Sequence, residues 1–491
     1  MTDKHFSYKT LDELRHEAEA LGVDVTFEEK LEAISKPVRI GTKTIGNSLA
    51  IHPMEGCDGT LDGRPDELTY RRWERFGEGG AKLIWGEATA IVPEGRANPR
   101  QLLLNDKTMS DFGRLLNGTR SKHRDVFGRD DDLMVGIQLT HSGRYSYPKP
   151  LIAYHHPQVD RMTYADKSRG IRVTSDYPVL SDDYLERLED VYVDAVKKAA
   201  AIGFDFVDIK QCHTYLLNAL LGARVRPGKY GGSFENRTRF IRNVLAKIKD
   251  AVGSRIIVGS RINAFDGIPF AEDPETKIGT PARYEIPYQY SFGIDKYNPL
   301  QEDLSEVLPF VKMLTESGVE LLNVSLGSPY YNMHIGRPFD RPPVDGYHSP
   351  EHPLVGVERH FRITGKIQEA FPNLPIVGTG YSWLQKFFIN AGESNIRRGR
   401  VKIVGIGRGA IAYPNYAKDI LNGIELKSSK VCYGASFCTD LMRSKNNELG
   451  QFATGCVPRD PVYTKIYKES LMANREKQAV EEVKVDGEKG K

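Results

Sequence analysis

The chain has 491 residues, of which 40% are hydrophobic and 27% are charged. This composition is typical of a globular protein rather than a disordered or fibrous one, and the length allows one large α/β domain or two ordinary ones. Because 68 basic residues are balanced by 65 acidic ones, the net charge is only +3, which argues against a nucleic-acid partner.

Residues 1–34 are predicted to form an N-terminal helical extension. Thr10 and Glu13 have the spacing of a capping box ahead of a short amphipathic helix, and the segment lacks the apolar core of a signal peptide. The sequence has no run of 18 apolar residues that would span a membrane, and its five cysteines are too few for a disulfide framework. We therefore expect a cytoplasmic, reduced protein without a membrane partner.

Residues 35–425 alternate between short apolar runs and longer helical stretches. The runs are NSLAIHPM, GAKLIWGEATAI, DLMVGIQLTH, GFDFVDI, SRIIVGSRIN, VELLNVSLG, LPIVGTG and VKIVGIG. Most are continuously apolar, as expected of strands buried on both faces. Eight strands alternating with helices predict an α/β fold, a (β/α)₈ TIM barrel. A doubly wound sheet is the competing fold, but no GxGxxG follows the first strand.

Two stretches between the runs, 182–203 and 234–253, have apolar residues at helical spacing and end in glycine, so each is predicted to be a helix. Two other segments, 142–180 and 264–302, are long loops after the third and fifth strands. Loops of this length in a barrel are usually functional or disordered. They are expected to cover a small-molecule substrate or to form the interface of a homo-oligomer.

In a (β/α)₈ barrel the active site lies at the C-terminal ends of the strands, and phosphate groups often bind after strands 7 and 8. The polar residues and glycines at those ends are Glu55, Glu87, Gln138, His141, Lys210, His213, Tyr215, Arg261, Gly378, Gly380, Gly407, Arg408 and Gly409. The last five are a candidate phosphate cradle, because glycines let backbone N–H groups approach an anion and an arginine adds a fork of donors.

Six ordered segments resemble one known family. They are HPMEG, GGAKLIWGEATAIVPEGR, GIQLTHSGR, GFDFVDIKQCHTYLLNALLGARVRPGK, the YGGSFENRTRF that directly continues it, and IGRGAIAYPNYAKDI. Together they are similar to the old yellow enzyme family of FMN-dependent barrels, especially the branch of 2,4-dienoyl-CoA reductase and trimethylamine dehydrogenase. The resemblance runs from about residue 35 to about residue 460.

The resemblance implies FMN as cofactor and NAD(P)H as electron donor. It assigns catalytic roles to Tyr215 as proton donor and to His213 and Lys210 as donors to a substrate carbonyl oxygen. Gln138 would bind the amide edge of the flavin ring, since an amide both donates and accepts, and Arg261 would sit near the charge of the reduced ring. The implied cofactor-binding residues are Pro53, Met54, Glu55, Ala88, Gln138, Arg261, Gly378, Gly380, Gly407 and Arg408.

Lys210 departs from the histidine pair, or histidine and asparagine, that the family offers here. Strand alternation places Asp208 and Lys210 on one face and Ile209 on the other. If that face is the barrel mouth, Lys210 points at the flavin. The alternative is a structural salt bridge from Lys210 to Asp208 or Glu87.

Residues 426–491 are predicted to be a C-terminal extension with a degenerate cysteine segment and a charged tail. Relatives in this branch bind a [4Fe–4S] cluster through four cysteines, whereas here Cys432, Cys438 and Cys456 stand with Ala435 at the remaining ligand position. Because four thiolates normally hold such a cluster, we expect no iron–sulfur cluster or other metal, and FMN as the only redox centre.

The sequence thus favours an FMN-dependent NAD(P)H oxidoreductase, an ene reductase acting on C=C bonds of α,β-unsaturated carbonyl compounds. One alternative is an FMN-dependent amine dehydrogenase or oxidative demethylase. Another, from a different class, is a flavin-free barrel lyase in which Lys210 forms a Schiff base.

Overall fold

The computed structural model describes residues 5–489, with side chains described up to residue 475. Eight parallel strands close into one barrel in the order β3, β4, β5, β8, β9, β12, β13 and β14, with β14 returning to β3. Their bounds are Leu49–Ile51, Leu83–Ala90, Met134–Thr140, Phe206–Ile209, Ile257–Asn263, Leu321–Ser325, Ile376–Gly378 and Ile403–Ile406. All eight predicted runs contain one of these strands, and the predicted (β/α)₈ barrel is confirmed.

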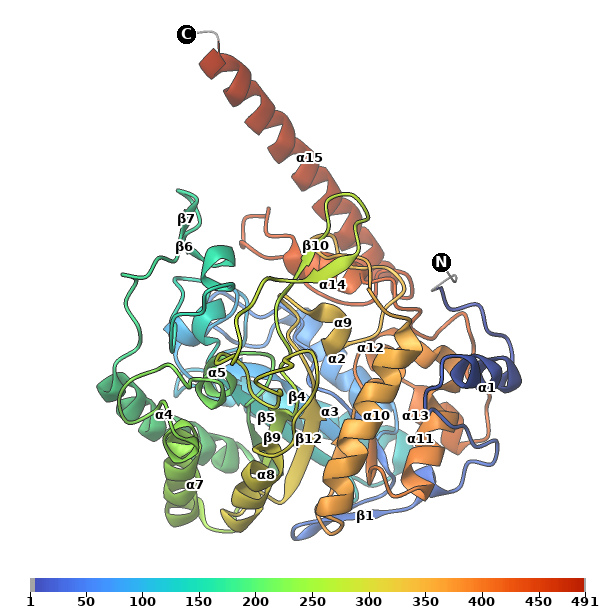
Figure 1. Cartoon of the computed structure of the whole chain (residues 1–491). Coiled ribbons are helices and arrows are strands. Elements are labelled where there is room, and N and C mark those ends of the chain that lie inside the picture. The colour runs from blue at the N-terminus through green and yellow to red at the C-terminus, as the bar shows by residue number, and fades with distance from the viewer. Residues whose placement is uncertain (1–4, 490–491) are drawn as a thin grey trace.

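Helices surround the barrel (Figure 1). They are α2 Glu67–Glu78, α3 Met109–Phe127, α4 Asp182–Ile202, α5 Leu216–Leu221, α6 Phe234–Arg237, α7 Arg239–Val252, α8 Val307–Glu316, α9 Met333–Gly336, α10 Pro353–Ala370, α11 Phe388–Arg397, α12 Arg408–Ala412 and α13 Tyr416–Leu421. The predicted helix 182–203 is α4, ended by Gly203 with φ 100°. The predicted single helix 234–253 is instead broken into α6 and α7 at Thr238. Arg237, just before the break, turns inward and donates to Glu306 at 2.7 Å.

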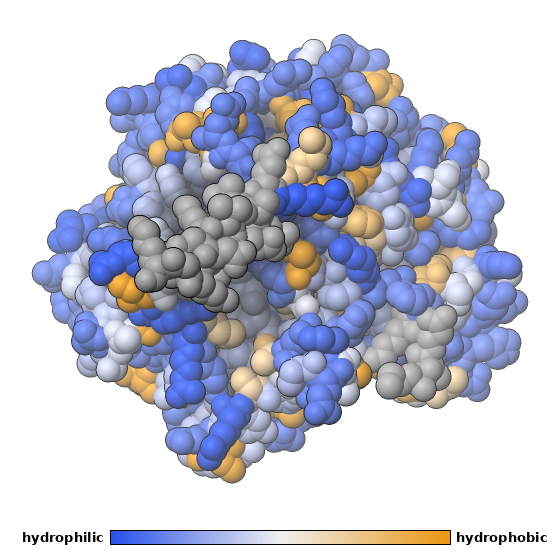
Figure 2. Space-filling view, turned by 90° about the horizontal axis from the view of Figure 1, so that it is seen from above, coloured by the Kyte–Doolittle hydropathy of each residue, from blue (hydrophilic) through white to orange (hydrophobic). Residues whose placement is uncertain are grey.

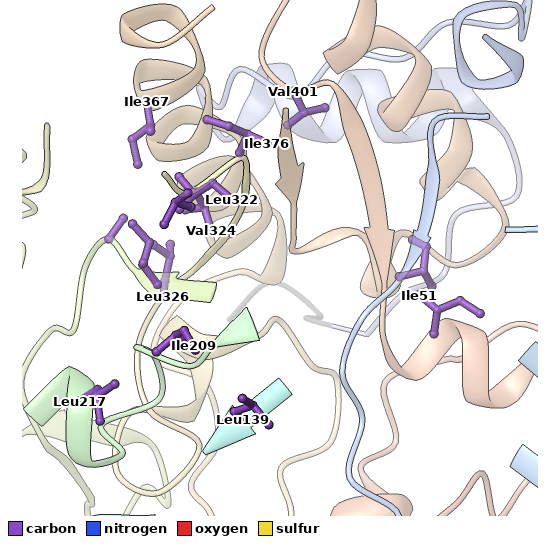
Figure 3. Close-up of a cluster of buried hydrophobic side chains, with 14 of the residues drawn as sticks. Ile51, Leu139, Ile209, Leu217, Leu322, Val324, Leu326, Ile367, Ile376 and Val401 are labelled. Atoms are coloured by element: carbon purple, nitrogen blue, oxygen red, sulfur yellow. The ribbon is translucent and has the colours of Figure 1, made fainter. Parts of the chain in front are cut away.

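The barrel has an inner and an outer apolar core, because successive side chains of a strand point to opposite faces. The inner core fills the barrel with side chains such as Trp85, Met134 and Phe206. The outer core, which includes Leu139 and Ile209, lies between the strands and the helices (Figure 3). In β8, therefore, Phe206 and Asp208 face inward and Ile209 faces outward, as the alternation predicted.

One end of the barrel is closed. The antiparallel hairpin of β1 (Val38–Ile40) and β2 (Lys43–Ile45) places Ile40 and Ile45 in the inner core. The helix α1 (Leu11–Ala20) packs Leu14 and Ala18 against the outer core. The opposite end, where the strands finish, is the mouth of the barrel.

The C-terminal segment lies over this mouth. It contains α14 (Phe437–Arg443) and α15 (Pro461–Lys489), which extends away from the barrel in Figure 1, and it has a small apolar core of its own around Leu441 and Phe452. The N–H of Thr454 donates to the carbonyl of Gly56 at 2.7 Å, and Asp460 pairs with Arg71 and Arg75 of α2. The division at residues 34 and 425 stays a prediction.

Both long loops carry short antiparallel hairpins. Segment 142–180 contains β6 (Tyr164–Asp166) and β7 (Ile171–Arg172), and segment 264–302 contains β10 (Phe270–Glu272) and β11 (Gly279–Pro281). Figure 1 shows both hairpins on the same side as α14. Within the described residues, none of the helices combines the length and hydropathy needed to span a bilayer.

Candidate active site

A layer of polar side chains lies above the inner apolar core, toward the mouth. Its residues lie side by side on neighbouring strands: Gln138 of β5 is in register with Asp208 of β8, and Arg261 of β9 is in register with Asn323 of β12. His52 follows β3 and is joined to Asn323 by a 3.1 Å hydrogen bond. The strand ends predicted to carry the chemistry therefore do meet at one place.

Asp208 organises this layer. Its carboxylate accepts hydrogen bonds from Trp85 Nε1 at 2.7 Å, from Gln138 Nε2 at 2.5 Å and from the N–H of Arg261 at 2.7 Å. Because Gln138 donates one amide hydrogen to Asp208, its orientation is fixed from below. Both ends of this amide were predicted to serve a flavin, but its nitrogen already donates to the Asp208 carboxylate.

Lys210 lies over the ring of Tyr215, which is hydrogen-bonded to a second tyrosine. Its Nζ sits 3.8 Å from the centre of the Tyr215 ring, and the hydroxyls of Tyr215 and Tyr330 share a 2.9 Å hydrogen bond. Tyr145 stacks on Tyr330 with ring centres 3.6 Å apart and an interplanar angle of 9°. This gives a cation and two coupled phenols, held in place by a third ring.

The alternative salt bridge from Lys210 is not formed. Asp208 is occupied as described above, and Glu87 points away from the mouth, where it binds Arg72 and Trp73 of α2. Across the described residues, no carboxylate lies within ion-pair distance of Lys210 Nζ. Burial lowers the pKa of this ammonium, although the neighbouring Cys212 and Glu55 favour its charged form.

His213 lies beside Lys210 in a strained turn. His213 and Thr214 have φ angles of 62° and 60°, a left-handed conformation that costs a non-glycine residue about 1–3 kcal/mol. The turn brings His213 Nε2 to 3.0 Å from Ser325 Oγ, at the end of β12. Burial, with Arg261 and Lys210 nearby, lowers the pKa of His213 well below its ordinary value. The imidazole is therefore neutral.

Among the described residues, neither Arg261 nor Arg408 forms an ion pair with a carboxylate. Arg261 is 8% exposed, and the Nε atoms of both guanidinium groups are buried without a hydrogen-bond partner. Burial lowers the pKa of Arg261, the neighbouring Cys212 and Asp208 act in the opposite direction, and Arg408 lowers it again. Arg261 and Arg408 therefore bring to the mouth two cations that have no ion-pair partners in the described part of the chain.

The predicted phosphate cradle comes together at the ends of β13 and β14. Met54 lies against Gly407, and Pro53 beside it is buried. At Gly380 the backbone has φ 93°, and a side chain there would meet His360 at 2.8 Å, so local packing alone requires this glycine. Gly378 is likewise crowded by Val401.

A second arginine, Arg337, approaches Arg408 and was not expected from the sequence. It donates to Ser436 and Thr439 of the C-terminal segment at 3.0 and 3.4 Å. Burial, together with the charge of Arg408, lowers the pKa of Arg337 to about 9. Two mutually repelling arginines make this corner of the mouth suited to a doubly charged anion.

Two further residues predicted at the strand ends, Ala88 and His141, differ in where they lie. Ala88 pairs in register with Gln138 after a bulge in β4. His141, at the end of β5, is not part of the mouth, since its ring bonds the Tyr184 hydroxyl of α4 at 2.9 Å.

Two polar residues of the site were not predicted. Asn98 donates to both Glu55 and Cys57. The other is Asn323, which the sequence could have indicated, because it is a single amide within the apolar run VELLNVSLG.

Glu55 is half-buried at the end of β3, and its titration gives a testable pH dependence. Burial raises its pKa from 4.5 to about 7. The folded state therefore holds this proton more tightly than the unfolded chain, so stability contributed here falls as the pH rises from about 4.5 to 7. We expect Glu55→Gln to show a smaller fall in Tm between about pH 5 and pH 8 than the wild type. The exposed control Glu19→Gln should keep the wild-type slope, and equal slopes in all three proteins would contradict this assignment.

Three cysteines gather next to Arg408. Cys432, Cys438 and Cys456 line one pocket, and Ala435 lines it too. Over the described residues, no three His, Cys, Asp or Glu side chains are grouped so that they could hold a metal ion. The expected lack of an iron–sulfur cluster stays a prediction.

The arginines at the mouth of the barrel suit an anionic ligand. Residues 33–277 match the NADH:flavin oxidoreductase / NADH oxidase family. The chain is 25% identical over 402 residues to an NADH oxidase of Thermoanaerobacter brockii, covering 78% of this chain and 50% of that protein. It is 27% identical over 302 residues to an NADPH dehydrogenase of Geobacillus thermodenitrificans, covering 58% of this chain and 70% of that protein.

Solved structures agree on the fold. A 2-naphthoyl-CoA reductase complex matches with a TM-score of 0.63 at 17% identity, over 89% of this chain and 58% of that one. An old yellow enzyme homologue from Zymomonas mobilis matches with a TM-score of 0.57 at 19% identity, over 81% of this chain and 95% of that one. The chain thus spans about half the length of the NADH oxidase, but nearly all of the smaller old yellow enzyme homologue.

The chain belongs to this NADH:flavin oxidoreductase family, which includes the old yellow enzymes. The assignment brings FMN as the cofactor. The residues present fit FMN. Arg408 and Arg337 suit its phosphate, and the unpartnered Nε of Arg261 suits a ring that gains negative charge on reduction.

Proposed function

We propose that the protein is an NAD(P)H:flavin oxidoreductase that reduces C=C bonds conjugated to a carbonyl group. The observation that carries this is the arrangement of Lys210, Tyr215 and Tyr330 beside the polar layer that contains Arg261 and Gln138. It offers a cation and a proton donor side by side, which reduction of such a bond requires.

FMN, when bound, supplies the hydride that is added to one carbon of the double bond. The protein must then supply a proton to the other carbon and stabilise charge on the carbonyl oxygen. Tyr215 is the proposed general acid, and Tyr330, hydrogen-bonded to it at 2.9 Å, is placed to return a proton to it.

Lys210 and neutral His213 are the proposed donors to the carbonyl oxygen. Burial and the neighbouring Tyr330 raise the pKa of Tyr215 well above 10, so the phenol would be a weak acid without help. An ammonium over its ring favours the phenolate left after proton transfer. Lys210 would thereby stabilise both the carbonyl oxygen of the substrate and the Tyr215 phenolate.

The other two hypotheses are less well supported. An amine dehydrogenase would bring a cationic substrate to a mouth that already holds Lys210, Arg261 and Arg408 without paired acids, which is unfavourable. The flavin-free lyase does not agree with membership of a flavin-dependent family. The cytoplasmic location and any homo-oligomer stay predictions.

Anaerobic half-reactions test the proposal. Purified protein should release FMN on denaturation, its bound flavin should bleach with NADPH or NADH, and an enone such as 2-cyclohexenone should restore the colour. Methylamines should neither bleach the oxidised flavin nor restore the reduced one. Bleaching by methylamines without turnover of any enone would instead establish the amine dehydrogenase.

A further inference from the structure

A buried acid at the head of the segment 264–302 takes no part in the proposed reaction. Asp266 follows the end of β9 and is 3% exposed. Its carboxylate accepts hydrogen bonds from Asn263 Nδ2 at 2.9 Å, from Asn218 Nδ2 at 3.1 Å and from the N–H of Phe292 at 2.9 Å. Burial raises the pKa of Asp266 from 3.8 to about 6, although these donors favour its charged form. At neutral pH the carboxylate is therefore ionised and can only accept.

The amide of Asn218 connects this acid to the turn that carries His213. Asn218 is the one polar residue of α5, whose sequence is LLNALL, and it is fully buried. Because Asp266 can only accept, the amide of Asn218 must direct Nδ2 toward the acid. Its Oδ1 then faces the other way and accepts from the N–H of Thr214 at 2.6 Å.

The turn needs such support because its backbone is strained. His213 and Thr214 both have positive φ angles, and a conformation of this kind persists only where the surrounding structure holds it. Besides the bond to Asn218, the hydroxyl of Thr214 meets Ser328 Oγ at 3.0 Å. Relaxation of the turn would carry the His213 ring away from Ser325, whose Oγ lies 3.0 Å from His213 Nε2.

The backbone of Asp266 supports the loop that carries Tyr330 as well. The carbonyl of Asp266 accepts from Asn332 Nδ2 at 2.7 Å, and Asn332 Oδ1 accepts from the N–H of Ser328 at 2.6 Å. The hydroxyl of Ser328 then accepts from the N–H of Tyr330 at 3.3 Å. Asp266 thus lies between the loop of Tyr330 and the turn of His213.

Bulk solvent has little access to this network. Figure 2, viewed from above, shows a hollow with mainly hydrophilic residues around it, whereas Asp266 and Asn218 are buried beneath the surface. The cavity that Asp266 lines together with Tyr145 and Thr214 has a volume of about 30 Å³, which is room for about one water molecule. A lost partner in the network therefore cannot be replaced by bulk water, and the remaining groups must reorient.

We propose that Asp266 is a positioning residue for the carbonyl donor His213, and that it acts through the amide of Asn218 and the N–H of Thr214. This inference rests on the proposed function, in which neutral His213 donates to the carbonyl oxygen of the acceptor. The chain of hydrogen bonds from acid to amide to turn determines where the imidazole lies. A displacement of about 1 Å of such a group can cost about 10² in rate.

Exchanging the acid and the amide tests this chain. In Asp266→Asn, a new N–H₂ group faces donors, and the amide of Asn218 can relieve the clash only by turning over, which brings its own N–H₂ group against the N–H of Thr214. In the double variant Asp266→Asn/Asn218→Asp, the carboxylate at position 218 again accepts from Thr214, and the amide at position 266 donates to that carboxylate and accepts from Phe292. Asn218→Ala breaks the chain but leaves Asp266 two of its donors, so the test remains possible if Asp266→Asn does not fold.

Three measurements are compared across these proteins. Hydrogen–deuterium exchange of the peptide that contains Thr214 needs neither ligand nor turnover. Binding of 4-hydroxybenzaldehyde to the oxidised protein, followed by flavin absorbance, reports the grip on a carbonyl oxygen, and reoxidation by 2-cyclohexenone reports turnover. The control is Glu393→Gln, because Glu393 is also a buried acid but accepts from the N–H groups of Ala33 and Ile34 at 2.8 and 3.1 Å.

Asp266→Asn and Asn218→Ala should keep their FMN, exchange faster at Thr214, bind the aldehyde about tenfold more weakly and reoxidise about 10² more slowly. The double variant should recover most of each loss. Adding His213→Ala to Asp266→Asn should cost little more, since residues that act as one unit are not additive. Glu393→Gln should lower Tm alone.

Three results would overturn the role of Asp266: unchanged exchange at Thr214 in the single variants, an exchanged pair no better than Asp266→Asn, or a loss fully additive with that of His213→Ala. A wild-type protein that reduces no enone would refute the proposed function instead. Exchange at Thr214 and binding of the aldehyde would still decide whether Asp266 positions His213.

Discussion

Arg261→Ala is expected to lower both the FMN content of the purified protein and the rate of flavin reduction by NADPH. The guanidinium is buried at the polar layer with an unpartnered Nε and without a paired acid, so its charge is available to a ring that becomes negative on reduction. Losing one such electrostatic contact costs about 10²–10³ in rate. Flavin content by absorbance and single-turnover reduction measure the two effects.

A matched control is Arg120→Ala at the far end of the barrel, where Arg120 pairs with Asp205 and Asp130. That variant should lose thermal stability but keep its flavin and its reduction rate. If Arg261→Ala retained full flavin content and an unchanged rate, the assignment of Arg261 to the ring would be wrong. Arg261→Lys should recover part of the rate, because it restores the charge but not the planar fork of donors.

Lys210→Met is expected to slow reoxidation of the reduced flavin by an enone by about 10²–10³, and to leave FMN content nearly unchanged. Methionine keeps an apolar stem against the Tyr215 ring but removes the ammonium that lies 3.8 Å from it. Without that charge, the carbonyl oxygen keeps only His213 as a donor, and the Tyr215 phenolate loses its neighbouring cation. Stopped-flow reoxidation after anaerobic reduction reports this step alone.

Comparing Lys210→Met with Tyr215→Phe and with the double variant shows whether Lys210 acts through Tyr215. If Lys210 acts partly through Tyr215, the double variant should be little slower than the slower single variant, because residues acting as one unit are not additive. A Lys210→Met protein with a lowered Tm and both half-reactions intact would make the lysine structural. The catalytic proposal would then depend on His213 and Tyr215 alone.

The sequence predicted the barrel well because its strands are buried on both faces. A run such as LPIVG contains no polar residue, which is typical of a buried strand. In a run that does contain polar residues, such as GFDFVDI, the period of two decides which face each residue takes. That reasoning placed Asp208 and Lys210 on one face and Ile209 on the other. In the structure Ile209 lies in the outer core, whereas Asp208 accepts from Trp85 of the inner core. Helix boundaries were less predictable, since the break at Thr238 follows from a distant contact of Arg237 with Glu306.

The parts of the site that the sequence did not predict come from loops. Tyr330, Tyr145 and Arg337 reach the mouth only through contacts with segments far away in the chain, and no local pattern marks them. The same is true of the partner of Gln138. An amide at a strand end suggests a binding role, but only the register of β5 against β8 shows that Asp208 already holds it.

The crossing of the mouth by the C-terminal segment has a consequence for how the protein is made. Domains generally fold from the N-terminus during synthesis, so the eight strands are complete before Arg443 and Thr454 have been added. The barrel can close, and its cofactor cradle can form, while the entrance is still unfinished. The contact of Thr454 with Gly56 then joins the newest part of the chain to the oldest strand of the barrel. The part of the entrance that this segment forms is therefore completed only after the barrel itself.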